Sequence, residues 1–165
     1  MIRDRACPVS DPVSVEARWA TLYEDSRPLL YRAAALMVGA AEAEEVVQEA
    51  FERAMRSRNF FDEVREPIAW LRTVCARQAL GRLRRRRVWE RIRVRLTVVE
   101  SSEPWEQAEL AIALRRLPAR DRVALVLRYY EDASYEEISD ALGIAPASVG
   151  PVLSRARAKV REAMA

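Results

Sequence analysis

The chain has 165 residues, a length that suits one medium domain or two small domains joined by a linker. It contains no histidine and only two cysteines, Cys7 and Cys75, far apart in the sequence. This composition excludes histidine-based acid–base catalysis, zinc fingers and histidine-ligated metals, and it favours reduced thiols over a disulfide framework. The longest apolar run, 33–41, is about half of the roughly 20 residues that a membrane-spanning helix needs, so we expect a soluble, cytoplasmic protein.

The net charge of +3 conceals an uneven distribution. Residues 77–95 contain nine arginines and one glutamate, and residues 152–165 contain four basic residues and one glutamate. The rest of the chain therefore carries a net charge of −8. Such segregation predicts two kinds of partner, one polyanionic and one basic.

Apolar residues recur at spacings of three and four along almost the whole chain, and only four residues are glycine. We therefore predict an all-α fold, with two small helical domains joined by a flexible linker. Residues 1–14 are expected to be a disordered tail, and residues 15–87 the first domain. Its predicted elements are a helix at 15–23, a second from Pro28 to Gly39, a third at 41–58, a loop at 59–66 and a fourth helix that begins at Pro67.

Residues 88–106 lose the helical period and end in a polar segment with a proline, which is typical of a linker between domains. The second domain is expected at 107–165. Its helix signals cover 106–117, 119–130, 135–142 and 146–163.

The second domain carries the pattern of a helix-turn-helix. Ser134 and Glu137 form a capping box that predicts a helix start, and Gly143 permits the left-handed conformation that ends this helix. Ser139 is small enough for close helix approach, and Val149 would pack the second helix, as a helix-turn-helix requires. The second helix is strongly basic. A bundle-closing helix with a solvated basic face is the alternative, but it does not explain why acidic i,i+4 partners are nearly absent.

The third predicted helix has an acidic stripe opposite its apolar face. Glu45, Gln48, Glu49 and Glu52 fall at i, i+3, i+4 and i+7. Simple solvent exposure is one explanation of the stripe, and a carboxylate metal site is another. Carboxylate di-iron bundles use Glu-x-x-His, and the chain has no histidine.

The fourth predicted helix continues into the arginine run 82–87, whose guanidinium groups could reach the phosphates of a nucleic acid. Phe60, Phe61 and Trp70 lie in or just after the preceding loop. Aromatic side chains beside a basic helix are typical of a surface that holds unstacked single-strand bases. The alternative is that Trp70 and one of the two phenylalanines belong to the core.

Three segments together resemble the extracytoplasmic-function group of bacterial sigma-70-type sigma factors. They are LLYRAAALMVGAAEAEEVVQEAFERAM from Leu29, PIAWLRTVCARQALGRLRRRR from Pro67, and LPARDRVALVLRYYEDASYEEISDALGIAPASVGPVLSRARAKVRE from Leu117. The most characteristic motifs are AEEVVQEAF, WLRTVCARQAL and YEEISDALG with the tail LSRARAKVRE. The resemblance covers roughly residues 15–163.

This resemblance implies a role for each patch. The acidic stripe would dock on the basic clamp helices of the largest RNA polymerase subunit. The first domain would open the minus-ten promoter element and hold its non-template strand through Asn59, Phe60, Phe61, Trp70, Arg77, Gln78, Arg82, Arg84, Arg85, Arg86 and Arg87. The second domain would bind the minus-thirty-five element and touch the flap of the second-largest subunit. Its candidate DNA-binding residues are Ser134, Ala147, Ser148, Pro151, Arg155, Arg157 and Lys159.

The chain departs from the family pattern at both DNA-binding surfaces. Gln78 and Gly81 stand where relatives usually carry Asn and Asp, which leaves the minus-ten base preference open. Gly150 and Pro151 replace side chains that could read bases, and Pro151 predicts a kink or a helix restart. Reading of the minus-thirty-five bases would then fall to Ala147, Ser148 and Arg155, while Arg157 and Lys159 contact phosphate.

The leading hypothesis is a promoter-specificity factor with no catalysis of its own, no cofactor and no metal. It would bind core polymerase and promoter DNA, and an anti-sigma factor would hold it inactive. A second hypothesis is a stand-alone helix-turn-helix regulator, which would bind duplex DNA without polymerase. A third is a nucleic-acid enzyme that uses the clustered carboxylates with magnesium.

Overall fold

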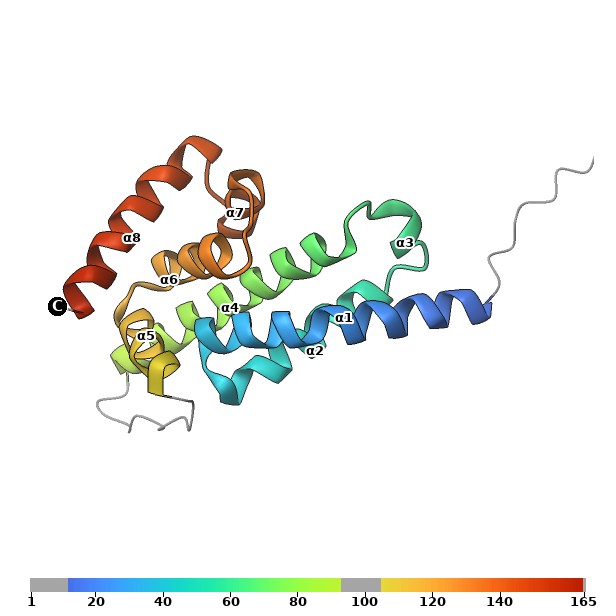
Figure 1. Cartoon of the computed structure of the whole chain (residues 1–165), viewed down its shortest axis with the longest axis horizontal. Helices are drawn as coiled ribbons and strands as arrows, with labels where there is room; N and C mark the ends of the chain where they lie inside the picture. Colours follow the sequence, from blue (N-terminus) through green and yellow to red (C-terminus); the bar gives the residue numbers. More distant parts are fainter. Residues whose placement is uncertain (1–11, 93–104, 165) are drawn as a thin grey trace, which may run out of the picture.

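The computed structural model describes residues 12–92 and 105–164, and all regular structure within these ranges is helical (Figure 1). The predicted all-α fold is confirmed. The first group of helices is α1 (Pro12–Val38), α2 (Ala40–Met55), α3 (Phe60–Glu63) and α4 (Pro67–Ile92). The second group is α5 (Trp105–Arg116), α6 (Ala119–Leu125), the π-helix η1 (Val126–Tyr130), α7 (Tyr135–Leu142), the 3-10 helix η2 (Pro146–Ser148) and α8 (Val149–Met164).

Helix α1 is longer than the sequence predicts. It begins at Pro12, three residues before the predicted start, and it runs through Pro28 without a break. A proline inside a helix lacks one amide donor and crowds the preceding turn. Buried apolar residues on both sides of Pro28, among them Leu22 and Leu30, hold the two halves on the same core, so tertiary packing outweighs the local signal. Residues 1–11, most of the predicted tail, lie outside the described part.

Helices α2 and α3 lie on either side of the turn at 56–59. Gly39 separates α1 from α2 with a φ of 99°, a backbone angle that favours glycine. Helix α2 ends at Met55, three residues before the predicted end, and the short helix α3 occupies part of the predicted loop 59–66.

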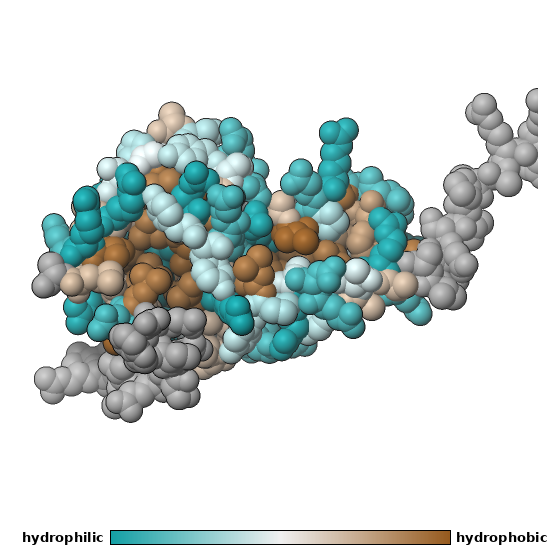
Figure 2. Space-filling view, viewed as in Figure 1, coloured by the Kyte–Doolittle hydropathy of each residue, from teal (hydrophilic) through white to brown (hydrophobic). Residues whose placement is uncertain are grey.

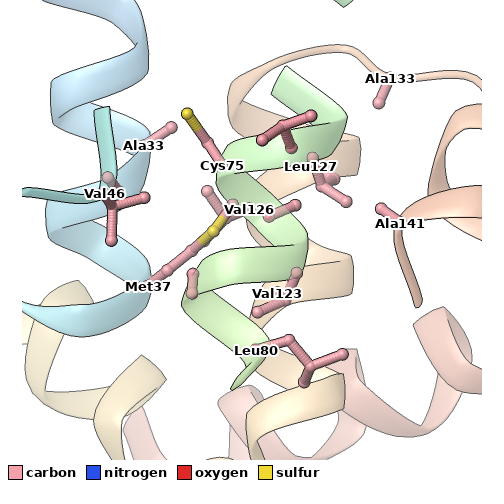
Figure 3. Packing of buried hydrophobic residues seen from close by; sticks show 14 of the residues in the cluster. Ala33, Met37, Val46, Cys75, Leu80, Val123, Val126, Leu127, Ala133 and Ala141 are labelled. Atoms are coloured by element: carbon pink, nitrogen blue, oxygen red, sulfur yellow. The ribbon is translucent and has the colours of Figure 1, made fainter. Parts of the chain in front are cut away.

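Helix α4 runs through the centre of the molecule and packs against both groups of helices (Figure 1). Its buried residues include Leu71, Cys75 and Leu80. Figure 3 shows α4 between Met37 of α1 on one side and Leu127 of η1 on the other. The two groups of helices therefore share one continuous apolar core.

The start of the predicted linker is helical, because α4 extends to Ile92. The remainder of that linker, 93–104, lies outside the described residues, and α5 begins at Trp105. Within the two described ranges, no helix combines the length and the apolar content needed to cross a membrane.

Two glycines give opposite expectations for substitution by alanine. Gly143 has a φ of 62°, so Gly143→Ala should lower the free energy of unfolding by about 1 kcal/mol. Gly81 lies inside α4, and an added Cβ would meet only the Arg85 guanidinium at 3.8 Å. Gly81→Ala should therefore raise the free energy of unfolding by up to about 1 kcal/mol. Urea denaturation measures both, and shifts of the same sign would contradict this interpretation.

Candidate nucleic-acid interface

The acidic stripe of α2 contacts the arginine-rich end of α4. Arg82 Nη1 donates to Glu45 Oε2 at 2.6 Å, and its other terminal nitrogen donates to Glu49. Arg86 forms an ion pair with Glu42, which also lies 3.7 Å from Arg82. The two patches that the sequence assigns to different partners thus neutralise each other in part.

The paired side chains differ in their exposure to solvent. The Arg82 side chain is only 16% exposed, whereas the side chains of Glu45 and Glu49 are 66% and 46% exposed. Glu52 is also exposed and accepts a hydrogen bond from Gln48 at 3.1 Å. The stripe therefore keeps outward carboxylates although Arg82 lies beneath it.

Gln78, a predicted minus-ten contact, also faces α2. When the Gln78 side-chain amide is oriented so that its nitrogen faces the two nearby acceptors, Nε2 donates to Glu49 Oε2 at 2.8 Å and to the Val46 carbonyl at 3.2 Å. Both amide hydrogens are then used within the first domain.

The arginines beyond Arg82 lie at the surface. Arg84, Arg85, Arg86 and Arg87 are all exposed, while Leu83, which precedes them, is buried. Only Arg86 of these four takes part in an ion pair with another described residue. Arg84, Arg85 and Arg87 are therefore the members of the run that phosphate groups can reach most freely.

The aromatic residues near α3 form a cluster in which one pair of rings is stacked and the others are tilted or edge-on. Phe60 is 2% exposed and packs between Trp19, at a centroid distance of 5.0 Å, and Trp70, at 5.1 Å. Phe61 is half-buried, and the Arg18 guanidinium lies 4.1 Å from its ring centroid. Phe60 is thus a core residue, as the alternative expected of one phenylalanine, whereas Trp70 is only partly buried and packs against the core.

A shallow cavity of about 430 Å³ opens beside Phe61. Arg18, Asp25 and Pro67 contribute to its lining, so it combines an aromatic face, a cation and a carboxylate. Asn59 is exposed and directly precedes α3, two residues before Phe61 in the sequence. An unstacked base requires a flat apolar face and nearby polar groups, and this cavity offers both.

The helix-turn-helix has the predicted local geometry. The Ser134 hydroxyl accepts from the Glu137 amide at 3.1 Å, and the Ser134 amide donates to the Glu137 carboxylate at 2.6 Å, so the capping box is confirmed. Gly143 is left-handed, and Val149 is fully buried. The Ser139 hydroxyl donates to the Ile144 carbonyl at 2.7 Å and closes the turn.

Pro151 does not interrupt α8, contrary to the predicted kink or restart. The helix begins at Val149, so Pro151 lies in its first turn, where backbone amides have no partner within the helix. Ala147, Ser148 and Pro151 are exposed on the outer side of this helix start, and Arg155 follows one turn later. The predicted base-reading residues are therefore accessible together.

Asp121 of α6 is a buried charge that the sequence did not indicate. Its side chain is 5% exposed and accepts a hydrogen bond from Lys159 Nζ at 2.7 Å, with Arg155 Nη2 at 3.8 Å. Lys159 is thus partly committed to Asp121, while Arg157 is exposed.

An apolar groove of about 530 Å³ lies between α1, α5, η1 and α8. Leu110 and Tyr129 are exposed in it, and Arg157 and Arg161 line one side. Figure 2 shows apolar surface gathered over this part of the second domain, with hydrophilic residues around it. A groove with this lining can receive an apolar helix face.

The two domains are joined by polar contacts as well as by the core. Arg77 donates twice to the Asp140 carbonyl, at 3.1 and 2.9 Å, and Arg72 Nη1 donates to Glu137 Oε1 at 3.0 Å. Arg122 Nη1 donates to the Met37 carbonyl at 2.8 Å. Arg77, a predicted minus-ten contact, is therefore engaged by the first helix of the helix-turn-helix.

Comparison with known proteins identifies the chain. Models of sigma-70 region 2 and sigma-70 region 4 match residues 22–88 and 107–160. The RNA polymerase sigma factor CarQ of Myxococcus xanthus is 31% identical over 129 residues, which cover 74% of each protein. The chain belongs to the sigma-70 family of RNA polymerase sigma factors.

Solved structures agree with this assignment. The sigma factor RpoE of Bartonella quintana, crystallised with the anti-sigma factor NepR, has the same fold, with a TM-score of 0.71 at 21% identity over 89% of this sigma factor and 96% of that chain. The extracytoplasmic function sigma factor SigJ of Mycobacterium tuberculosis is 27% identical with a TM-score of 0.62, over 86% of this sigma factor and 52% of SigJ. The sigma factor is therefore of the extracytoplasmic-function type, as its motifs predicted.

The comparisons favour the sigma factor over the stand-alone regulator. Sigma factors are in general transcription initiation factors rather than enzymes. Within residues 12–92 and 105–164, the structure contains no cluster of three or more Cys, Asp or Glu side chains that could hold a metal ion. Glu42, Glu45 and Glu49 of α2 pair with arginines of α4.

Glu131 is a buried acid of the described part of this sigma factor, and its pKa departs strongly from the ordinary value. Its side chain is 2% exposed at the domain interface, 3.8 Å from Arg72. Burial raises the pKa of Glu131 to about 7, Arg72 opposes this rise and Glu137 adds to it. Burial and the neighbouring Glu131 also raise the pKa of Cys75 to about 12, so this thiol stays protonated.

The raised pKa of Glu131 predicts a pH-dependent stability. Between pH 4.5 and about 7 the folded chain retains a proton that the unfolded chain has lost, so the free energy of unfolding should fall as pH rises, by up to about 3 kcal/mol. Glu131→Gln should remove this fall. Urea denaturation from pH 5 to pH 8 measures it, with Asp132→Asn, a side chain that is 96% exposed, as the control. Parallel curves for wild type and Glu131→Gln would refute the assignment.

Proposed function

We propose that this sigma factor binds core RNA polymerase through α2, melts the minus-ten element with α3 and α4, and binds the minus-thirty-five element with its helix-turn-helix. The observation that carries this proposal is the sorting of charge on the surface. Outward carboxylates lie on α2, free arginines on α4 and an exposed basic face on α8. The functional units would be residues 15–87 and 107–165, joined by residues 88–106.

The polymerase surface is the outer side of α2. Glu45 and Glu52 present carboxylates to solvent, and the basic clamp helices of the largest subunit would pair with them. Gln48 is exposed between them and can donate to a carbonyl or a carboxylate of the partner.

The minus-ten surface is the cavity beside Phe61 together with Arg84, Arg85 and Arg87. The Phe61 ring and the Arg18 guanidinium would stack on an unpaired base of the non-template strand. The arginines would contact its phosphates. This division separates base capture from backbone binding.

The minus-thirty-five surface is the exposed start of α8. Ala147, Ser148 and Arg155 would face the bases in the major groove, and Arg157 would contact phosphate. Pro151 offers only apolar contact, so the thymine methyl group is the feature of a base that it can recognise.

Two protein partners fit the second domain. The apolar groove beside Leu110 and Tyr129 would take the flap of the second-largest polymerase subunit. An anti-sigma factor would be the inhibitory partner, because RpoE, a structural neighbour of this chain, was solved with the anti-sigma factor NepR. Another neighbour, CnrH, was solved in complex with the cytosolic domain of CnrY. The protein would act in the cytoplasm, where the polymerase is, without enzymatic activity of its own.

Transcription from fragmented genomic DNA tests the proposal. Bacterial core polymerase is supplied with or without this protein, and every new RNA start is mapped. Starts that require the protein and share a pair of upstream elements support the sigma function. A folded sample, free of any inhibitor, that yields no new start would overturn it and favour the stand-alone regulator.

Loss of outward carboxylates should weaken polymerase binding. The pair Glu45→Ala and Glu49→Ala removes two charges of the acidic stripe, and we expect at least a tenfold loss of affinity for core polymerase. Fluorescence anisotropy of the labelled protein measures this affinity. Glu24→Ala, an exposed glutamate of α1, serves as the control and should have little effect. Equal affinities for both variants would show that the stripe is only solvated surface.

The free arginines should set the salt dependence of promoter binding. For the complex with core polymerase, Arg84→Ala with Arg87→Ala should reduce the slope of log affinity against log salt by about two. Arg82→Ala should leave the slope nearly unchanged, because Arg82 is held by Glu45 and Glu49. A larger change in Arg82→Ala than in the double variant would reverse this assignment.

A further inference from the structure

One row of side chains on α8 runs from the exposed start of the helix to a cation that is half-buried. Pro151, Arg155 and Lys159 follow one another at spacings of four, so they lie along one side of the helix. Pro151 and Arg155 are exposed, whereas the Lys159 side chain is only 37% exposed. The side of α8 proposed to face DNA therefore ends in a charge that is partly withdrawn from solvent.

The cause of this withdrawal is Asp121 of α6, the helix that packs on α8 (Figure 1). The Asp121 side chain is 5% exposed, and its Oδ2 accepts a hydrogen bond from Lys159 Nζ at 2.7 Å. Arg155 Nη2 lies 3.8 Å from Oδ1 of the same carboxylate. One buried acid thus contacts two cations that are separated by one turn of α8.

A role in the start of α6 explains Asp121 only in part. Asp121 lies in the first turn of α6, where a carboxylate interacts favourably with the helix dipole. An exposed carboxylate would have this benefit as well, whereas a buried one loses its hydration and must be compensated by a partner. Lys159 is that partner, although a helix start does not require one. The contact therefore has a consequence for α8 as well as for α6.

Lys159 differs from every other basic side chain of the protein. It is the only lysine among the 28 Lys and Arg residues. A lysine carries its charge at one nitrogen, whereas an arginine presents a fork of donors that matches a phosphate. Because Nζ lies on Asp121, the Lys159 charge is neutralised within the protein, and the nearby carboxylate repels a phosphate. Lys159 is thus poorly placed for the phosphate contact that the sequence predicts.

Arg155 keeps its donors available for DNA. Its side chain is 57% exposed, and the 3.8 Å distance from Nη2 to Asp121 is too long for a hydrogen bond. The carboxylate therefore attracts the guanidinium group without using its donors. An arginine oriented in this way can present its fork to the O6 and N7 acceptors of a guanine in the major groove.

We propose that Asp121 is a positioning residue for minus-thirty-five recognition: it keeps Lys159 off the DNA phosphates and orients Arg155 toward the bases. This role rests on the proposed function and concerns the specificity of the same surface. Binding at this element then depends less on charge and more on base contacts. Loss of the carboxylate should strengthen binding to unrelated sequences and make the protein less selective.

Asp121→Asn tests the role because asparagine has nearly the same shape without the charge. Asp132→Asn is the matched control, since it makes the same change at a side chain that is 96% exposed. Circular dichroism checks that both variants are folded. Each variant is bound to core polymerase, and the affinity of the complex is measured for a promoter found by start mapping and for the same promoter with its minus-thirty-five element scrambled.

We expect Asp121→Asn to steepen the slope of log affinity against log salt by about one on both duplexes, and to reduce the ratio of the two affinities about fivefold. Asp132→Asn should change neither quantity. If Asp121 only stabilised the fold, Asp121→Asn would weaken binding to both duplexes with an unchanged slope, and the positioning role would be wrong.

A second variant identifies the cation that is released. In a Lys159→Gln background, Asp121→Asn should no longer steepen the slope, because the charge that the carboxylate held back is absent. A slope that still steepens by about one in this background would contradict the role assigned to Lys159.

The single lysine permits a further test that needs no change at Asp121. The complex with core polymerase is treated with acetic anhydride, and mass spectrometry of the peptide that contains Lys159 measures the rate of acetylation. In the wild type, promoter DNA should leave this rate nearly unchanged. Strong protection by DNA would show that Lys159 contacts the duplex and would overturn the proposal.

Failure of the positioning role is distinguishable from failure of the sigma function. Protein-dependent starts in wild-type transcription, together with equal slopes for Asp121→Asn and Asp132→Asn, would leave the sigma function standing and refute the positioning role. If the wild-type protein yields no start, the sigma function fails and the positioning role fails with it.

Discussion

The structure depends on helix α4 being buried on two sides. One side packs on α1 and α2, and the other packs on α6 and α7, so this single helix joins both groups of helices in one core. This position explains why α4 is apolar at Leu71 and Cys75 but charged at its end. Arg84, Arg85, Arg86 and Arg87 are exposed at this end, whereas Arg72 and Arg77 contact α7 and Arg82 lies under the carboxylates of α2.

Helix α4 also links the charges on the α2 surface to those on its own surface, because Arg82 contacts Glu45 and Glu49. Glu45 and Glu49 belong to the surface proposed for a basic partner, yet they also hold Arg82 in place. A partner that draws these carboxylates outward changes the surroundings of α4 as well. Binding at α2 and binding at α4 are therefore joined by contacts within one domain, in addition to the contacts between domains.

Local features of the sequence predicted local structure well. The start of α7 follows from Ser134 and Glu137, and its end follows from Gly143, because capping depends on residues within one turn. Contacts between distant segments could not be predicted in this way. Glu45 and Arg82 are 37 residues apart, and only the packing of α2 on α4 brings them together. The continuity of α1 through Pro28 likewise depends on the core beneath it.

The π-helix η1 has a consequence for how this chain aligns with relatives. A π turn holds one more residue than an α turn, so Val126–Tyr130 adds one residue to the end of the helix that begins at Ala119. A relative with a plain α-helix here would be one residue shorter, and every later position would shift by one. An alignment that overlooks the extra residue would place Glu131 opposite the relative's counterpart of Tyr130 or Asp132, which are both exposed. It would then fail to show whether the relative also has a buried acid between the two domains.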